Sequence, residues 1–115
     1  HAPKVTWSHS KDMRSVKVVT DFIPQGEVTL WQAYNPTDRD FRIAPTNISY
    51  QPTSLTGHCS KKSCEYLLPK DTNKNGWTSR FVELTYQNQS ERLVLTSPAF
   101  ISPNVYPKAG NNIEQ

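Results

Sequence analysis

The chain has 115 residues, with 13 Lys and Arg, 10 Asp and Glu, and a formal net charge of +3. This length suits one domain with a single hydrophobic core. The basic residues are scattered singly, apart from Lys61-Lys62, so the pattern excludes the basic stripe typical of nucleic-acid-binding proteins. No run of about 18 apolar residues is present, which excludes a membrane-spanning helix.

Short segments rich in Val, Ile, Thr and aromatic residues recur along the chain, with turn residues between them. This spacing is typical of an all-β fold and not of alternating strands and helices. The predicted strands cover residues 5–9, 15–20, 27–34, 41–43, 48–55, 65–68, 78–87 and 92–96. Pro52 places its strand at a sheet edge or at a bulge. Residues 97–101 are expected to continue the last strand beyond a proline bend.

Alternation within the strands assigns their faces. Trp31 lies on the face of its strand opposite Leu30, and core packing is the favoured interpretation for Trp31. In the longest strand, Val82, Leu84 and Tyr86 share one face. This strand is expected to pair with residues 92–96 across the turn at residues 88–91.

Seven or eight antiparallel strands, with a Trp on the third, predict an immunoglobulin-like or fibronectin type III-like β-sandwich. We expect the sandwich to span residues 1–103. Residues 104–115 include Pro107, Gly110 and two Asn, with little to bury, and are expected to form a poorly ordered tail.

The two cysteines stand at the ends of a polar tetrapeptide, in Cys59-Ser60-Lys61-Lys62-Ser63-Cys64. This spacing predicts a disulfide that pins a hairpin turn, with a stabilisation of about 2 kcal/mol. A metal site would need further ligands, and only His58 is near. The cysteines are too close in sequence to form the inter-sheet bridge of antibody domains.

Two features favour a secreted, extracellular protein. The sequence begins at His1 with neither a Met nor a leader, so we expect either a removed signal peptide or a piece of a longer chain. Asn47-Ile48-Ser49 and Asn88-Gln89-Ser90 match the acceptor pattern for N-glycosylation. The predicted glycosylation sites are therefore Asn47 and Asn88.

Several strings, in the same order across residues 4–103, resemble one known family. They are Leu30-Trp31-Gln32-Ala33-Tyr34-Asn35-Pro36 with Arg39-Asp40-Phe41-Arg42, then Tyr50-Gln51-Pro52, and Gly76-Trp77-Thr78 leading into Phe81-Val82-Glu83-Leu84-Thr85-Tyr86. This set resembles the C-terminal β-domain of the PhoPQ-activated pathogenicity-related proteins. The resemblance implies an appendage to an α/β-hydrolase-like region. The sequons and cysteines favour its eukaryotic branch, which includes secreted autocrine proliferation repressors.

No residue set in the sequence predicts catalysis. The Gly-x-Ser-x-Gly nucleophile elbow of such hydrolases is missing from the chain, and 115 residues cannot hold that fold. Ser8-His9-Ser10 and His58 have no spacing that indicates a triad. We therefore expect a non-catalytic chain without a cofactor, whose hydrolase-like region, if there is one, lies elsewhere.

Two metal sites were weighed as minor alternatives. Asp71, Asn73, Asn75 and Gly76 match the opening of a calcium loop. Its twelfth position is Val82, however, and an Asn- and Gly-rich turn needs no metal. His1 could form a copper site through its amine and imidazole if His9 or His58 supplied a second imidazole.

The candidate interface consists of Trp77, Arg39 and Arg42, because Trp77 follows a polar turn and could lie at an end of the sandwich, where loops gather. An alternative for Arg39 is a structural pair with Asp40. Two functions stay open: an accessory module that docks onto another domain or chain, expected to be hydrolase-like, or a free-standing metal- or carbohydrate-binding module. An exposed apolar patch would favour the first.

Overall fold

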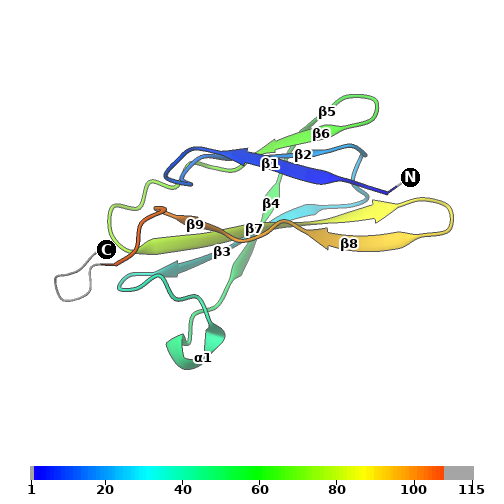
Figure 1. The fold of residues 1–115 in the computed structure, drawn as a ribbon. Coiled ribbons are helices and arrows are strands. Elements are labelled where there is room, and N and C mark those ends of the chain that lie inside the picture. Colours follow the sequence, from blue (N-terminus) through cyan, green and yellow to red (C-terminus); the bar gives the residue numbers. More distant parts are fainter. Residues whose placement is uncertain (1, 108–115) are drawn as a thin grey trace.

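The structure, a computed structural model, describes residues 2–107 apart from the side chain of Pro45, and shows a two-layered β-sandwich (Figure 1). Its elements are β1 (Val5–His9), β2 (Val16–Thr20), β3 (Val28–Asn35), α1 (Ile43–Thr46), β4 (Gln51–Leu55), β5 (His58–Cys59), β6 (Cys64–Leu67), β7 (Trp77–Gln87), β8 (Arg92–Thr96) and β9 (Phe100–Ser102). Within the described residues, no helix is long and apolar enough to cross a membrane.

All strand pairs in the two sheets are antiparallel. The first sheet has the order β1-β2-β6-β5, and the second has the order β4-β3-β7-β8, with β9 also paired to β7. This arrangement matches the two sheets of an immunoglobulin-type sandwich, in which a fourth strand extends the second sheet. The predicted fold class is therefore confirmed.

The described residues form nine strands instead of the seven or eight predicted. One extra strand is β5, which the sequence analysis did not separate from the cysteine hairpin. The other arises because the last strand is interrupted at residues 97–99. Ser97 still exchanges hydrogen bonds with Val82, but Pro98 has no N–H to continue the ladder, and β9 then pairs with the first half of β7.

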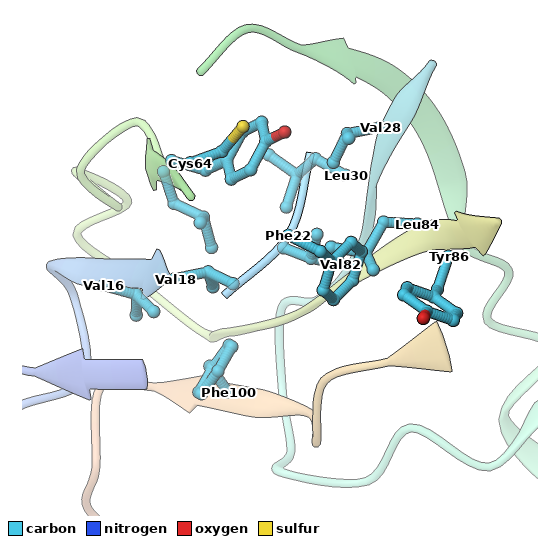
Figure 2. Close-up of a cluster of buried hydrophobic side chains, with 12 residues drawn as sticks. Val16, Val18, Phe22, Val28, Leu30, Cys64, Val82, Leu84, Tyr86 and Phe100 are labelled. Atoms are coloured by element: carbon cyan, nitrogen blue, oxygen red, sulfur yellow. The ribbon is translucent and has the colours of Figure 1, made fainter. Parts of the chain in front are cut away.

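The core lies between the sheets and is formed by alternate residues of the inner strands (Figure 2). Its largest group comes from the predicted inner face of β7, where Val82, Leu84 and Tyr86 are 0%, 2% and 7% exposed. Leu30 of β3 faces them, and Phe22 packs edge-to-face on Tyr86 with ring centroids 5.1 Å apart. The predicted hairpin of β7 and β8 is also confirmed.

Trp31 does not pack between the sheets, contrary to the sequence-based interpretation. Its neighbour Leu30 takes the core position, and period-two alternation turns Trp31 to the outer face of the second sheet. There it stacks on Phe81 of the adjacent strand, with ring centroids 6.3 Å apart, and its indole N–H donates to Glu83 at 2.9 Å.

The strand predicted at residues 41–43 is also wrong. Residues 36–50 instead form a long connection that contains α1 and lies on the side of the second sheet away from the first (Figure 1). Its last residue, Tyr50, reaches the outer face, where its hydroxyl is 2.7 Å from Ser79 and its ring contacts Phe81 edge-to-face. This connection explains how Ser79 is fully buried on an outer face.

The predicted disulfide joins Cys59 to Cys64 across the β5–β6 hairpin. The turn between them closes with a 2.8 Å hydrogen bond from Ser60 N to Ser63 O. Cys64 is fully buried, whereas Cys59 is exposed. The bridge therefore pins a turn at the edge of the first sheet, as its spacing predicts.

The predicted start of the tail, residue 104, falls inside the described segment. Asn104 N donates to Asp12 O at 2.9 Å, and Val105 O accepts a hydrogen bond from the Trp77 indole. Residues 108–115 lie outside the described residues.

Candidate functional site

Two of the three residues predicted at an interface meet at one end of the sandwich. Trp77 opens β7, and its indole Nε1 donates to Val105 O at 2.9 Å. The Arg39 guanidinium, from the loop after β3, lies over the Tyr106 ring, with Cζ 4.6 Å from the centroid. We call Arg39, Trp77, Val105 and Tyr106 the end patch. Three segments far apart in sequence build it.

The end patch combines two exposed apolar side chains with two half-buried ones. Tyr106 is 75% exposed and Val105 is 54% exposed, while Trp77 and Arg39 are half-buried. The Nε of Arg39 is buried and has no hydrogen-bond partner among the described residues. Buried donors without a partner are uncommon in folded proteins, and Arg80 Nε is the other such atom among the described side chains.

A buried asparagine holds the loop that carries Arg39. The Asn35 side chain accepts hydrogen bonds from the backbone of Thr37 and Asp38, and its amide donates to Asp40 O at 2.8 Å. Asn35 is only 6% exposed. This bonding is the side-chain turn that Asn favours after a strand, and it fixes the position from which Arg39 reaches Tyr106.

Arg42 does not join the end patch. Its Nη2 lies 2.6 Å from Asp40 Oδ2 in an exposed ion pair, so the structural pair proposed for Arg39 and Asp40 is instead Arg42 and Asp40. The side-chain hydrogen bond from Arg42 lowers the pKa of Asp40 to about 2, with help from the Arg42 backbone N–H. Arg42 therefore forms its ion pair within its own loop.

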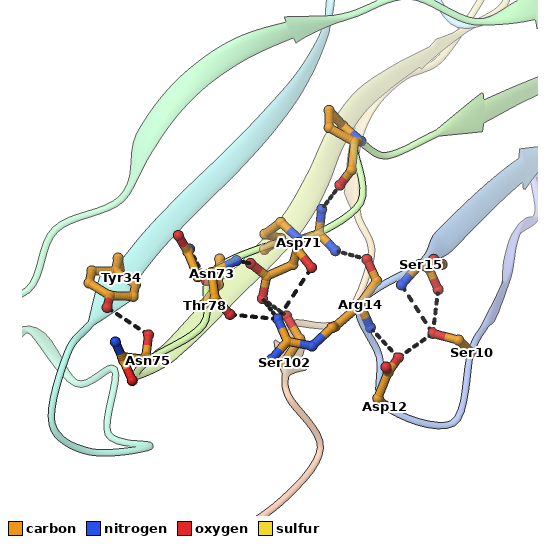
Figure 3. Close-up of polar contacts among 12 residues, drawn as sticks. Ser10, Asp12, Arg14, Ser15, Tyr34, Asp71, Asn73, Asn75, Thr78 and Ser102 are labelled. Atoms are coloured by element: carbon orange, nitrogen blue, oxygen red, sulfur yellow. Dashed lines mark hydrogen bonds and ion pairs between the residues drawn. The ribbon is translucent and has the colours of Figure 1, made fainter.

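The turn that was a minor alternative for calcium makes its polar contacts within the protein (Figure 3). Asp71 is buried, accepts a 2.6 Å hydrogen bond from the Ser102 hydroxyl, and lies 3.5 Å from Arg14 Nη1. The Asn73 amide donates to Thr78 Oγ1, and Asn75 O accepts from the Tyr34 hydroxyl. These contacts point to separate protein partners and not to a shared centre.

The backbone geometry of this loop requires glycine at position 76. Gly76 has a φ of +75°, and a Cβ there would lie 2.5 Å from Asn35 O. Only glycine fits both the conformation and the close approach, so the turn residues are accounted for without a metal. Within residues 2–107, no cluster of three His, Cys, Asp or Glu side chains could hold a metal ion.

The histidines weighed for copper or catalysis lie apart. His9 is on β1 and His58 on β5, at opposite edges of the first sheet. The His9 Nδ1 is 2.8 Å from the Ser10 carbonyl oxygen. His1 lies outside the described residues, so its proposed copper ligation stays a prediction.

A buried arginine is the main feature that sequence reasoning missed. Arg80 is 1% exposed on the inner face of β7. Its guanidinium donates to the Pro69 carbonyl and, at 3.0 Å, to the Arg14 carbonyl, while its Nε has no partner among the described residues. Burial lowers the pKa of Arg80, and the nearby Asp71 charge partly offsets this. The sequence did contain a signal for this: Arg80 is two residues before Val82, so strand alternation places both on the same inward face.

A second missed feature is a groove on the outer face of the second sheet. It has a volume of about 440 Å³ and is lined by Trp31, Ile43, Ser49, Tyr50, Phe81 and Glu83. Trp31 and Phe81 are half-buried, and Ile43 is 68% exposed. We call this site the outer-face groove.

The two sequon asparagines differ in their surroundings. Asn88 organises the β7–β8 turn: its Oδ1 accepts from Ser90 N and Glu91 N, and its Nδ2 donates to the Tyr86 hydroxyl at 3.0 Å. Asn47 ends α1 with a left-handed φ of 60° and is exposed.

Searches against protein-family models, curated proteins and solved structures found no match to this chain.

Proposed function

We propose that this chain is a non-catalytic, extracellular accessory module that binds a neighbouring domain or chain through the end patch. The convergence of Trp77, Arg39 and the 105–106 segment carries the proposal. Aromatic side chains and arginine are the residues most enriched where protein interfaces bind tightly. Loops at one end of a sandwich are also the usual place for recognition on a rigid scaffold.

The chemistry of the end patch supports a protein surface as the partner. The Arg39 guanidinium is part-exposed beside Tyr106, and its N–H groups can donate to a carbonyl or carboxylate oxygen of a partner. Next to it, Val105 and Tyr106 offer apolar area. A partner with an acidic or carbonyl group beside an apolar contact would satisfy both features.

Extracellular routing is supported by the disulfide and the two sequons, because disulfides persist in oxidising compartments. We also propose that this chain is related to the PhoPQ-activated pathogenicity-related proteins, whose β-domain it resembles. This kinship indicates the class of partner. In that case the end patch contacts a hydrolase-like region of the same or a second chain.

The first experiment is the intact, non-reduced mass and the N-terminal sequence of the natural polypeptide. A mass far above 13.1 kDa plus sugars is expected, because the partner region would then belong to the same chain. A photoreactive phenylalanine analogue at position 106 of the full chain should next cross-link to a segment outside these 115 residues, located by mass spectrometry of the linked peptides.

The matched control places the same analogue at Gln89, which is exposed in the β7–β8 turn. Position 89 should give no cross-link, and Arg39→Ala should reduce the cross-link at position 106. A natural polypeptide of 13.1 kDa plus sugars, with no cross-link from position 106 to any other chain, would refute the proposal. Metal and glycan binding by the alternative free-standing module should be tested in that case.

A further inference from the structure

The outer-face groove is an unusual surface for the outside of a single sandwich. Trp31 and Phe81 stand side by side there with nearly parallel rings, 16° apart, and Tyr50 closes one side. The groove is not purely apolar, because Glu83 and Ser49 also line it. The Glu83 carboxylate accepts a hydrogen bond from the Trp31 indole, and a carboxylate can accept from more than one donor. The occupant should therefore combine apolar C–H groups with hydroxyl or amide donors.

A sugar has this combination. A pyranose ring presents C–H groups on its faces, which pack on aromatic rings, and hydroxyl groups around its edge, which donate to carboxylates. Aromatic side chains with a polar group beside them suit such a mixed surface. A glycan attached to the protein next to the groove would supply such a sugar.

The sequon of Asn47 lies beside the groove. Its third residue, Ser49, lines the groove together with Ile43 at the start of α1. The Cα atoms of residues two apart are at most about 7 Å from each other, so the residue that would carry the glycan belongs to the same short segment as Ser49 of the groove wall. The Asn47 backbone N–H is bonded to Ile43 O at the end of α1. The attachment point is thus held by the segment that forms one wall of the groove.

The second sequon, at Asn88, does not line the outer-face groove. Asn88 lies in the β7–β8 turn, and both ends of its side-chain amide bind within that turn or to Tyr86. None of its sequon residues lines the outer-face groove. Asn47, by contrast, takes part in α1 through its backbone N–H.

We propose that Asn47 carries an N-linked glycan whose first sugars occupy the outer-face groove and cover Trp31 and Phe81. The glycan completes the outer layer of the second sheet, beside the 36–50 connection. This inference rests on the extracellular routing in the proposed function and is independent of the end patch.

The test uses the full natural chain, secreted from a eukaryotic host that adds N-linked glycans. Glycopeptide mass spectrometry should find Asn47 occupied. Hydroxyl-radical footprinting of the folded protein should then show a several-fold higher oxidation rate at Trp31 after complete enzymatic deglycosylation. Trimming to the first N-acetylglucosamine should leave part of the protection, and the rate at Trp7 should not change.

Matched variants separate the glycan from the groove residues. Asn47→Asp removes the acceptor without changing a residue that lines the groove and should expose Trp31, whereas Ser49→Thr keeps the sequon and should keep the protection. Ser90→Ala removes the second sequon and should leave Trp31 unchanged.

Three results would overturn the inference: an unoccupied Asn47 in the secreted protein, an unchanged Trp31 after deglycosylation, or a protected Trp31 in a chain without the Asn47 glycan. The last result would assign the groove to a neighbouring domain or a second copy. Absence of sugar from both sequons would count against extracellular routing as well, while the cross-link from position 106 would still decide the end patch.

Discussion

The inner face of β7 differs between its two halves, although both are buried. In the second half, Val82, Leu84 and Tyr86 pack among apolar side chains (Figure 2). In the first half, Arg80 is 1% exposed and Thr78 is 5% exposed, and their partners are carbonyl and amide groups of distant loops. Figure 3 shows how Asp71, Arg14 and Ser102 complete this polar cluster.

One strand face can therefore hold two kinds of core. Apolar packing is non-directional and tolerates shifts that keep the buried volume. Hydrogen bonds to a buried guanidinium are directional, and leaving one unmade is costly. The polar half therefore fixes where residues 14, 69–73 and 102 lie, and with them the entry into β7 that places Trp77 in the end patch.

The largest predicted effect tests the apolar half. Leu84→Ala removes a side chain that is 2% exposed and should lower the free energy of unfolding by about 3–5 kcal/mol through lost transfer energy and a cavity. Urea unfolding followed by tryptophan fluorescence measures this. Leu67→Ala is the matched control, because Leu67 is 69% exposed, and should change stability by less than about 0.5 kcal/mol. Equal losses in both variants would show that the apolar half is not the core.

The next effect tests the polar half. Asp71→Asn keeps the shape of the side chain but removes the charge that faces Arg14 and Arg80. It should lower the free energy of unfolding by about 2–3 kcal/mol, because a buried cation loses its compensation. Chemical denaturation compares it with Glu65→Gln, the same change at an exposed site on β6, which should be nearly neutral.

A second substitution sharpens this prediction. Arg80→Met removes the buried cation, so adding it to Asp71→Asn should cost less than it costs in the wild-type chain. A double-mutant cycle measures the coupling between the two positions. Strict additivity would mean that Asp71 and Arg80 do not act as one cluster.

The smallest effect concerns an exposed pair, as a contrast to the buried one. Arg42 lowers the pKa of Asp40 from 3.8 to about 2. Because the folded pKa is depressed, the stabilisation is present above the unfolded pKa and is lost as the pH falls from about 4 towards 2. An NMR titration of the Asp40 carboxyl should give this value, and Arg42→Gln should raise it towards 3.8. Added salt should weaken the shift, since the pair is exposed. A pKa of 3.8 in the unmodified protein would contradict the pair.

Local patterns predicted the elements whose partners are close in sequence. The β7–β8 hairpin and the cysteine hairpin are both as expected, because a short turn leaves few alternative registers. The inner face of β7 was also predicted from alternation. Arg80 was missed because alternation by itself does not tell where an inward face leaves its apolar neighbours and meets carbonyl groups.

The site was predicted only in part. The sequence groups Trp77, Arg39 and Arg42 as an interface candidate and assigns residues 105–106 to a tail, whereas the structure brings Trp77 and Arg39 to residues 105–106 and pairs Arg42 with Asp40. A Trp on the third strand of an immunoglobulin-like sandwich favours a core position for Trp31, but Leu30 occupies the core in the adjacent position. Size and hydrophobicity do not decide which face of a strand is covered, since a long connection such as residues 36–50 can cover the second face.

The all-β class, the alternation of the longest strand and the disulfide follow from the amino-acid sequence, because each depends on periodicity or on neighbours a few residues apart. Only the tertiary structure decided which sheets those strands join, why an arginine is buried, and how the end patch and the outer-face groove are assembled. These features need contacts between residues far apart in the chain, such as Arg14 with Asp71 or Trp77 with Val105. Such contacts form only when closing the intervening loops is offset by the burial and hydrogen bonding of the whole sandwich.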